Sequence, residues 1–364
     1  MDTRDKEPEL MLPDIGVVPP PPEYLDLANN AVATDVALTP EKDQLEKSPT
    51  PLQESLRRLR HDIRAMVSLG VIILVVLIAI VGPFIYQRVG SVYNSEQNGP
   101  VPASVYHSFS HEELIRQDEG PSAQYWLGTD DLGRDMLSRL MQGMLISVTV
   151  ALLVEVVDIL LGTTVGVLAG YFGGWIDQIL ARFTDLMFAF PGLLFAILLT
   201  GIFGPATDAA LAGFPVIGPN GNARLVVVSL ALAFTIWPLM ARYVRGQTLQ
   251  LKEQQFIEAA RTSGTSNGRI ILRHIIPNLS SIVVIASTLN ISNTIIGEAG
   301  LSLLGLGVQA PGASLGLMIS DSTPQLQDHP WEIIVPTAML AIIVLAFSFL
   351  GDGLRDAFDP RSKD

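Results

Sequence analysis

The sequence contains no cysteine in its 364 residues. Disulfide bonds, thiolate nucleophiles and cysteine-bound metals are therefore excluded. It also has no G-x-x-x-x-G-K-[ST] phosphate loop and no H-E-x-x-H zinc motif, the signatures of nucleotide hydrolysis and of metalloprotease chemistry. We accordingly assign no catalytic and no metal-binding residue, and we expect a protein that is not itself an enzyme.

Charged residues are scarce, and most of them are acidic. They make up 16% of the chain, against about a quarter of an ordinary soluble domain. Hydrophobic residues make up 49%, and the mean hydropathy is +0.39. The formal net charge of -13 argues against nucleic acid as a partner. The composition predicts that a lipid bilayer surrounds much of the chain.

Six apolar runs are long enough to cross a membrane. They lie at 65–86, 145–169, 185–203, 223–241, 280–301 and 333–350. A helix rises about 1.5 Å per residue, so about 20 residues cross a hydrocarbon core of roughly 30 Å. The predicted fold is an all-α integral membrane protein with six transmembrane helices, the last five forming one domain within 141–352.

Basic residues indicate which ends face the cytoplasm. They gather at 57–64, directly before the first run, and in the loop 242–278, whereas 183–223 and 274–354 contain no lysine or arginine. Short cytoplasmic loops of membrane proteins carry such an excess. Both termini are therefore predicted to be cytoplasmic. The segment 87–140 is predicted to be external, although it carries four arginines.

The two ends of the chain differ from its apolar middle. Residues 1–56 are acidic and rich in proline, with four consecutive prolines at 19–22. This composition favours disorder, so we predict a disordered cytoplasmic tail, either passive or partner-binding. The basic cluster and first helix then occupy 57–86, and residues 353–364 are predicted to form a short cytoplasmic tail.

The loop 242–278 contains helix-forming segments of its own. Phe256, Ile257 and Ala260 form a narrow apolar stripe that could enter a groove on another protein. Gly264 is expected to end this first helix, because glycine tolerates the left-handed conformation. A second short helix is expected to finish before Pro277. An ordinary amphipathic loop is the alternative interpretation.

Motifs spread over residues 57–361 resemble those of one family. They read EAARTSG at 258–264, IIP at 275–277, LGTDDLGRD at 127–135, AGYFGGWID at 169–177, EAGLSLLGLG at 298–307 and GDGLRDAFDPR at 351–361. The set resembles permease subunits of binding-protein-dependent ABC importers for dipeptides, oligopeptides and nickel, closest to the dipeptide permease C type. Leu303 stands where phenylalanine is usual. The resemblance implies the type I importer fold.

The resemblance also implies a role for the loop 242–278, which in this family couples to the ATPases. The residues carried over are Glu258, Ala259, Ala260, Arg261, Gly264, Ile276 and Pro277. The chain would bind no cofactor itself. ATP and magnesium would be used by two cytoplasmic ABC ATPase subunits, whose closure would move the loop as a lever.

Further partners follow from the same resemblance. It implies a second homologous permease subunit and an extracytoplasmic solute-binding protein, in the inner (cytoplasmic) membrane of a prokaryotic cell. The chain would form half of a translocation path for dipeptides or oligopeptides. Nickel chelates, glutathione and oligosaccharides are alternative substrates. An independent secondary carrier is the rival from another class.

Polar residues inside the apolar runs are candidates for the translocation path. Glu155 and Asp158 share one face of the second run, and a carboxylate in lipid is costly unless it faces a cavity or a partner. Asn290, Asn293 and Glu298 on the fifth run offer groups suited to a peptide backbone or amine. Hydrogen bonding between helices explains these residues as well.

The external segment carries two further patterns. Alternating Asp and Arg in 127–135 are expected to lock a loop by local ion pairs, with direct substrate contact as the alternative. His107 and His111 have a spacing that could bind a metal on a helix. Ser110 and Glu113 form the pattern of a capping box, which instead favours a solvent-exposed helix start.

Overall fold

The computed structural model describes residues 51–96, 98–213 and 223–358. Most of the predicted tail, residues 1–50, lies outside this range, as do residues 359–364. Residues 51–56, which we assigned to the tail, instead begin helix α2 (Pro51–His61). Glu54 and Arg58 pair across one turn of α2 at 2.7 Å, a spacing that supports a helix.

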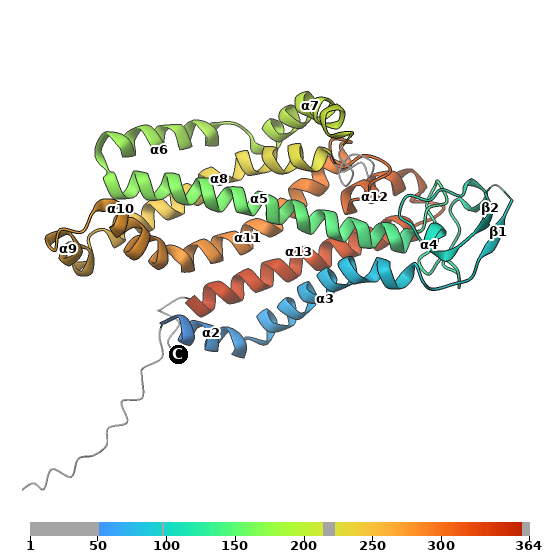
Figure 1. Cartoon of the computed structure of the whole chain (residues 1–364), viewed down its shortest axis with the longest axis horizontal. Helices are drawn as coiled ribbons and strands as arrows, with labels where there is room; N and C mark the ends of the chain where they lie inside the picture. The colour runs from blue at the N-terminus through green and yellow to red at the C-terminus, as the bar shows by residue number, and fades with distance from the viewer. Residues whose placement is uncertain (1–50, 97, 214–222, 359–364) are drawn as a thin grey trace, which may run out of the picture. The chain divides into compact units, whose positions relative to one another are not determined.

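Six helices in the described part of the chain are long and apolar enough to cross a membrane, as predicted. They are α3 (Ile63–Tyr86), α5 (Met136–Phe172), α7 (Gly192–Leu211), α8 (Arg224–Leu251), α11 (Ile276–Leu303) and α13 (Trp331–Phe358). Figure 1 shows α3, α5, α8, α11 and α13 running lengthwise. Because α5 starts at Met136 and α13 ends at Phe358, both helices extend into segments that we predicted to be an external loop and a tail.

The third span differs from the prediction. The run 185–203 is divided between α6 (Gly174–Ala189) and α7, and only α7 has the length and hydropathy of a span. Phe190 adopts an extended conformation at the break, with ψ of 133°. The following Pro191 accounts for this, because a residue before proline is disfavoured in the helical region.

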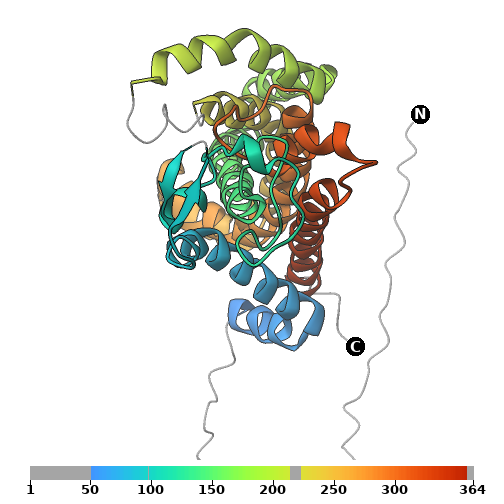
Figure 2. The ribbon, with the colours of Figure 1, turned by 90° about the vertical axis from the view of Figure 1, so that its right-hand side faces the viewer.

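Shorter elements lie at the two ends of the helices. One end carries β1 (Tyr93–Ser95), β2 (Gly99–Val101), α4 (Ala103–Tyr106), η1 (Leu114–Arg116), α12 (Leu315–Ser322) and η3 (Thr323–Gln325). The strands form an antiparallel hairpin in which Tyr93 faces Val101. Figure 2 shows this hairpin and α4 in front of the end of α5. The other end carries α9 (Gln255–Thr262), α10 (Asn267–Ile270) and the π-helical turn η2 (Ile271–Ile275).

The predicted ion-pair lock is present at the end with the hairpin. Arg134 pairs with Asp130 at 2.8 Å, and both side chains are buried. The ion pairs extend beyond the motif at 127–135. Arg139 on α5 contacts Asp130 and also Asp321 on α12, each at 3.1 Å. The ion pairs therefore tie the loop before α5 to α12.

The capping-box prediction is wrong, because no helix starts at Ser110. The Glu113 carboxylate is buried and accepts hydrogen bonds from Ser95, from Tyr93 at 3.0 Å and from Asn98 at 3.0 Å. Burial works to raise the pKa of Glu113, but these three hydrogen bonds to the charged form hold it below its ordinary value. Glu113 therefore anchors the hairpin.

The histidines of the external segment do not converge on a metal site. His107 is buried, and its Nδ1 contacts Asp135, which also caps the first turn of α5. His111 lies 3.7 Å from Glu113. No three His, Cys, Asp or Glu residues of the described ranges are grouped so that they could hold a metal ion.

The most extensive helix packing among the described residues joins α5 to α8, along a stripe of glycines. Gly162, Gly166 and Gly170 follow one another at every fourth residue of α5. A Cβ added to Gly166 would meet the carbonyl of Ala241 and the side chain of Val244. Small residues allow such backbone approach inside a membrane, where van der Waals contact drives association. The G-x-x-x-G spacing in an apolar run is a sequence signal for this kind of contact, additional to the motifs from which the fold was predicted.

Replacing Gly166 with leucine should separate α5 from α8. Overpacking of this kind costs about 1–3 kcal/mol, so the thermal unfolding midpoint in detergent should fall by several degrees. Intrinsic tryptophan fluorescence would measure it. Gly201→Leu on α7 is the matched control, since an added Cβ there meets no atom within 4 Å. Equal midpoints for the two variants would contradict the packing role.

Candidate functional site: a helical elbow and buried polar groups

The loop between the fourth and fifth spans forms a helical elbow, which we define as residues 255–270. As expected, α9 ends just before Gly264, which adopts a left-handed φ of 76°. The next amide, that of Thr265, donates to the carbonyl of Ala260 at 3.1 Å, which closes the end of α9. No atom lies within 4 Å of an added Cβ at Gly264, so backbone conformation rather than space requires glycine.

Ile257 anchors the elbow to its own chain. Its side chain is fully buried in an apolar cluster with Ile270, Ile275 and Val244. This corrects the expectation that Ile257 would enter a groove on another protein. A single sequence shows that a helix has an apolar stripe, but not which surface covers it. Phe256 is different, because 43% of it stays exposed.

Tyr171, at the end of α5, holds the elbow from a second side. Its hydroxyl donates to Oδ1 of Asn267 at 2.9 Å. The guanidinium carbon of Arg261 lies 5.4 Å from the centre of the same ring. A cation at this position is attracted to the ring face. One side chain of α5 therefore contacts both α9 and α10.

We expected the second helix of the elbow to finish before Pro277, but the helical segment continues past this residue. The amide of Ile276 donates to the carbonyl of Ile271, five residues back, and the helix then continues as α11. A π-helical turn has this i to i+5 pattern. Pro277 itself is tolerated because it lies in the first turn after the register change, where a missing amide costs least. The elbow is thus continuous with the fifth span.

One face of α9 is left open. Glu258, Ala259, Arg261 and Gly264 are all exposed, and Ala260 is half-buried. Ala259 and Ser263 are one turn apart, so small side chains occupy the middle of this face. Of the other carried-over residues, Ile276 and Pro277 lie at the start of α11 and are exposed. This open face could receive another protein.

Two ion pairs fix α6 to α8 near the elbow. Arg245 contacts Asp177 through two nitrogens, the longer contact being 2.7 Å, and Arg242 contacts Asp185 at 2.8 Å. The hydrogen bonds from Arg245 hold the pKa of Asp177 below its ordinary value. Asp177 belongs to the AGYFGGWID motif, so that motif supplies a brace between helices.

Most of the residues predicted to line the translocation path are buried between helices of this chain. Glu155 and Asp158 on α5 are buried, and Asp158 accepts a hydrogen bond of 2.9 Å from Asn290 on α11. Glu298 is also buried, and its carboxylate accepts from Ser147 at 2.9 Å and from Ser302 at 2.7 Å. Two of these hydrogen bonds, from Asn290 to Asp158 and from Ser147 to Glu298, join α5 to α11.

Asn293 is the exception among the five, because its side chain is exposed on α11. An amide on a membrane helix is expected to face a polar partner or a water-filled path rather than lipid. The structure therefore singles out Asn293 as the candidate that faces outward, and a contact with substrate stays a prediction for it.

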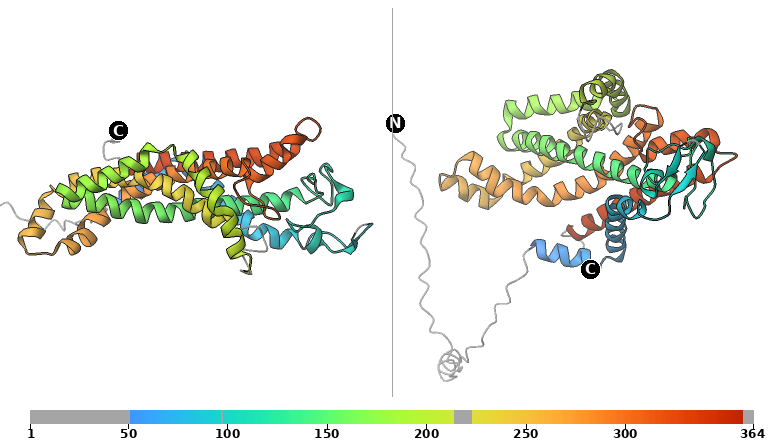
Figure 3. Two further views of the ribbon diagram at one scale, coloured as in Figure 1. Left: turned by 90° about the horizontal axis from the view of Figure 1, so that it is seen from above. Right: turned by 45° about the vertical axis from the view of Figure 1, so that its right-hand side comes forward.

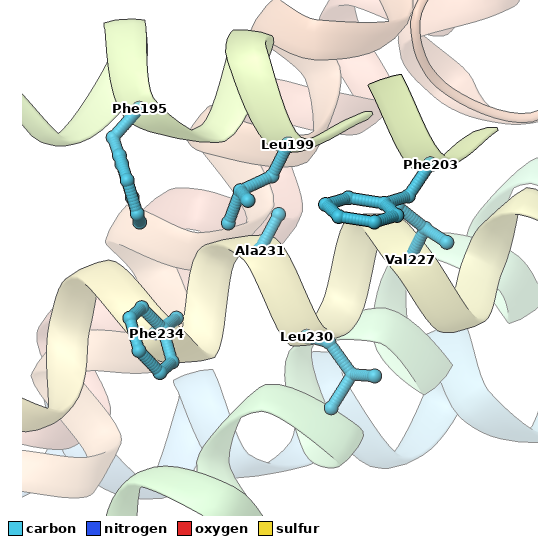
Figure 4. A pocket seen from close by; sticks show the side chains of 7 residues that line it. All are labelled: Phe195, Leu199, Phe203, Val227, Leu230, Ala231 and Phe234. Atoms are coloured by element: carbon cyan, nitrogen blue, oxygen red, sulfur yellow. The ribbon is translucent and has the colours of Figure 1, made fainter. Parts of the chain in front are cut away.

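A recess of about 270 Å³ lies between α7 and α8. It is lined by Phe195, Leu199, Phe203, Val227, Leu230, Ala231 and Phe234 (Figure 4). None of these side chains can form a hydrogen bond, so the recess is unsuited to a peptide backbone. Its chemistry fits apolar groups alone.

Comparison with known proteins places the chain in a family. Residues 162–364 match the family model described as binding-protein-dependent transport system inner membrane component. Residues 50–100 match the N-terminal transmembrane domain of oligopeptide transport permease C. The second match covers α2 and α3, which precede the helices of the first.

Individual relatives match over most of their length. A dipeptide transport system permease protein of Alkalihalophilus pseudofirmus is 35% identical, with 89% of this chain and 94% of the relative covered. An oligopeptide transport system permease protein of Bacillus subtilis is 36% identical, with 87% and 92% covered. A glutathione transport system permease protein of Pectobacterium atrosepticum is 40% identical, with 71% and 80% covered. The chain belongs to the family of binding-protein-dependent transport system inner membrane components.

Proposed function

We propose that this chain is a permease subunit of an ATP-driven importer and forms half of the translocation path for dipeptides or oligopeptides. The observation that carries the proposal is the elbow: an exposed face on α9, fixed to α5 and continuous with α11, in a chain of this family. Two of the relatives are named for dipeptide and oligopeptide transport, which supports peptides over the alternatives. Glutathione, nickel chelates and oligosaccharides would suit the same architecture.

The proposed partners are those that membership of this family implies. The chain has no phosphate-binding loop, so ATP and magnesium would be bound by two separate cytoplasmic ATPase subunits. A second permease subunit would complete the path, and an extracytoplasmic binding protein would deliver the peptide. The elbow would face the cytoplasm of a prokaryotic cell, as would both termini. Three exposed arginines support this orientation: Arg261 and Arg269 in the elbow and Arg273 directly after it.

The contacts of the elbow suggest how ATPase movement would reach the path. Closure of the ATPases would displace α9. Ile257 and Tyr171 would pass this displacement to α5, and the unbroken helix through η2 would pass it to α11. These two spans also share the hydrogen bond between Asp158 and Asn290. They would therefore move together, as rigid bodies rocking between two states.

Purification from native membranes in mild detergent tests the proposed function. A second permease and ATPases should copurify, and binding protein loaded with a peptide should stimulate ATP hydrolysis. Nickel chelates and oligosaccharides would be assayed in parallel with their own binding proteins. Uptake by this chain alone in proteoliposomes, driven by an ion gradient, would instead establish the secondary carrier.

Glu258→Lys should uncouple the importer, because it reverses a charge on the open face of α9. We expect the amount of peptide imported per ATP hydrolysed to fall about tenfold or more, which corresponds to about 1.4 kcal/mol of lost interaction. The amount of the chain in the membrane should not change. Glu253→Lys, at an exposed position before α9, is the control. Normal uptake by the Glu258 variant would refute the docking role.

Tyr171→Phe should weaken the link between α5 and the elbow while keeping the ring under Arg261. Loss of one hydrogen bond costs about 1 kcal/mol, so peptide imported per ATP hydrolysed should fall a few-fold. Tyr171→Ala should lower this ratio further. Tyr243→Phe, at an exposed tyrosine of α8, is the matched control. An unchanged ratio in both Tyr171 variants would show that the elbow acts without this contact.

A further inference from the structure

The junction between α2 and α3 is a sharp turn at the entry to the first span. Asp62 adopts an extended conformation, with φ of -78° and ψ of 104°, and its carboxylate accepts from the amides of Arg64 and Ala65. It therefore ends α2 and caps α3. In the predicted topology, residues around Asp62 lie where the chain passes from water into the membrane.

Three arginines at this junction are exposed. Arg57 and Arg60, one turn apart on α2, form no ion pair or side-chain hydrogen bond with another described residue. The Arg64 side chain is 75% exposed, and its contact with Asp62 is long, at 3.6 Å. Arg58 differs, because it pairs with Glu54 at 2.7 Å. We call Arg57, Arg60 and Arg64 the junction arginines.

Packing against the last span holds the junction in place. A Cβ added to Gly353 on α13 would meet the side chains of Ala65 and Asp62, so α13 packs closely against the turn. Helix α2 also contacts α13, beside which it lies in Figure 3. The junction arginines are therefore presented from a fixed position at the ends of two spans.

Large apolar side chains flank the junction arginines. Leu56, Ile63 and Val67 are 44%, 77% and 60% exposed. Leu56 lies on α2, and Ile63 and Val67 lie in the first turns of α3. Where α3 enters a bilayer, these side chains would contact its hydrocarbon, which would bring the guanidinium groups beside them to the depth of the lipid phosphates. Helices with a basic polar face and an adjacent apolar face bind at this depth.

We propose that the junction arginines form a binding site for the headgroups of anionic phospholipids. A guanidinium group donates two parallel hydrogen bonds to a phosphate and stays charged at any physiological pH. Lipid, rather than a protein, is favoured because the apolar flank continues directly into the exposed surface of α3. The proposal does not depend on the transported substrate or on the ATPases.

Lipid retention by the purified full-length chain tests the proposal. Native mass spectrometry in mild detergent would compare phosphatidylglycerol with phosphatidylcholine of the same acyl chains. Each arginine near an anionic surface contributes about fivefold, so the three together should give a preference of about a hundredfold. The preference should weaken as salt is added.

Variants separate binding from correct insertion. Arg57→Gln and Arg60→Gln should each lower the preference for phosphatidylglycerol about fivefold. Replacing all three junction arginines with lysine should keep most of this preference and preserve the topology. Arg269→Gln with Arg273→Gln, exposed arginines of the elbow end, should leave the preference unchanged. Equal retention of both lipids by the natural chain would overturn the proposal. So would an unchanged preference in the glutamine variants, which would place the lipid elsewhere.

Discussion

The approach of α5 to α8 along the glycine stripe is the contact on which the other elements depend. Lipid tails are as apolar as leucine, so two helices gain little from burial in a bilayer and must gain from close contact. The stripe supplies that contact by bringing backbone against side chain. On this pair, α6 is braced by the ion pair of Arg245 with Asp177, and the elbow rests on Val244 and Tyr171.

Polar side chains then connect this pair to the remaining spans. The pairs Asp158 with Asn290 and Ser147 with Glu298 join α5 to α11. A polar group inside a membrane is costly alone and acceptable when hydrogen-bonded, so such contacts fix which helix faces meet. Helix α5 therefore contacts the elbow, the fourth span and the fifth span.

Features with a local cause could be predicted from the sequence. Five of the six spans follow from run length, the third being displaced by the break at Phe190, and the end of α9 follows from the conformational freedom of Gly264. Features that depend on distant partners could not. The inward direction of Ile257 requires a cluster drawn from α5, α8, α10, η2 and α11, and the hairpin around Glu113 requires donors up to 20 residues away. Pro191 and Pro277 show the limit of a local rule, because one breaks a helix and the other does not.

The π-helical turn before Pro277 has a geometric consequence for the whole elbow. It accommodates one more residue than an α-helical turn would over the same rise, and one residue corresponds to about 100° of rotation about a helix axis. The turn thus sets the angle at which the open face of α9 is presented relative to α11. Loss or gain of a single residue there would aim that face in a different direction while leaving every span intact.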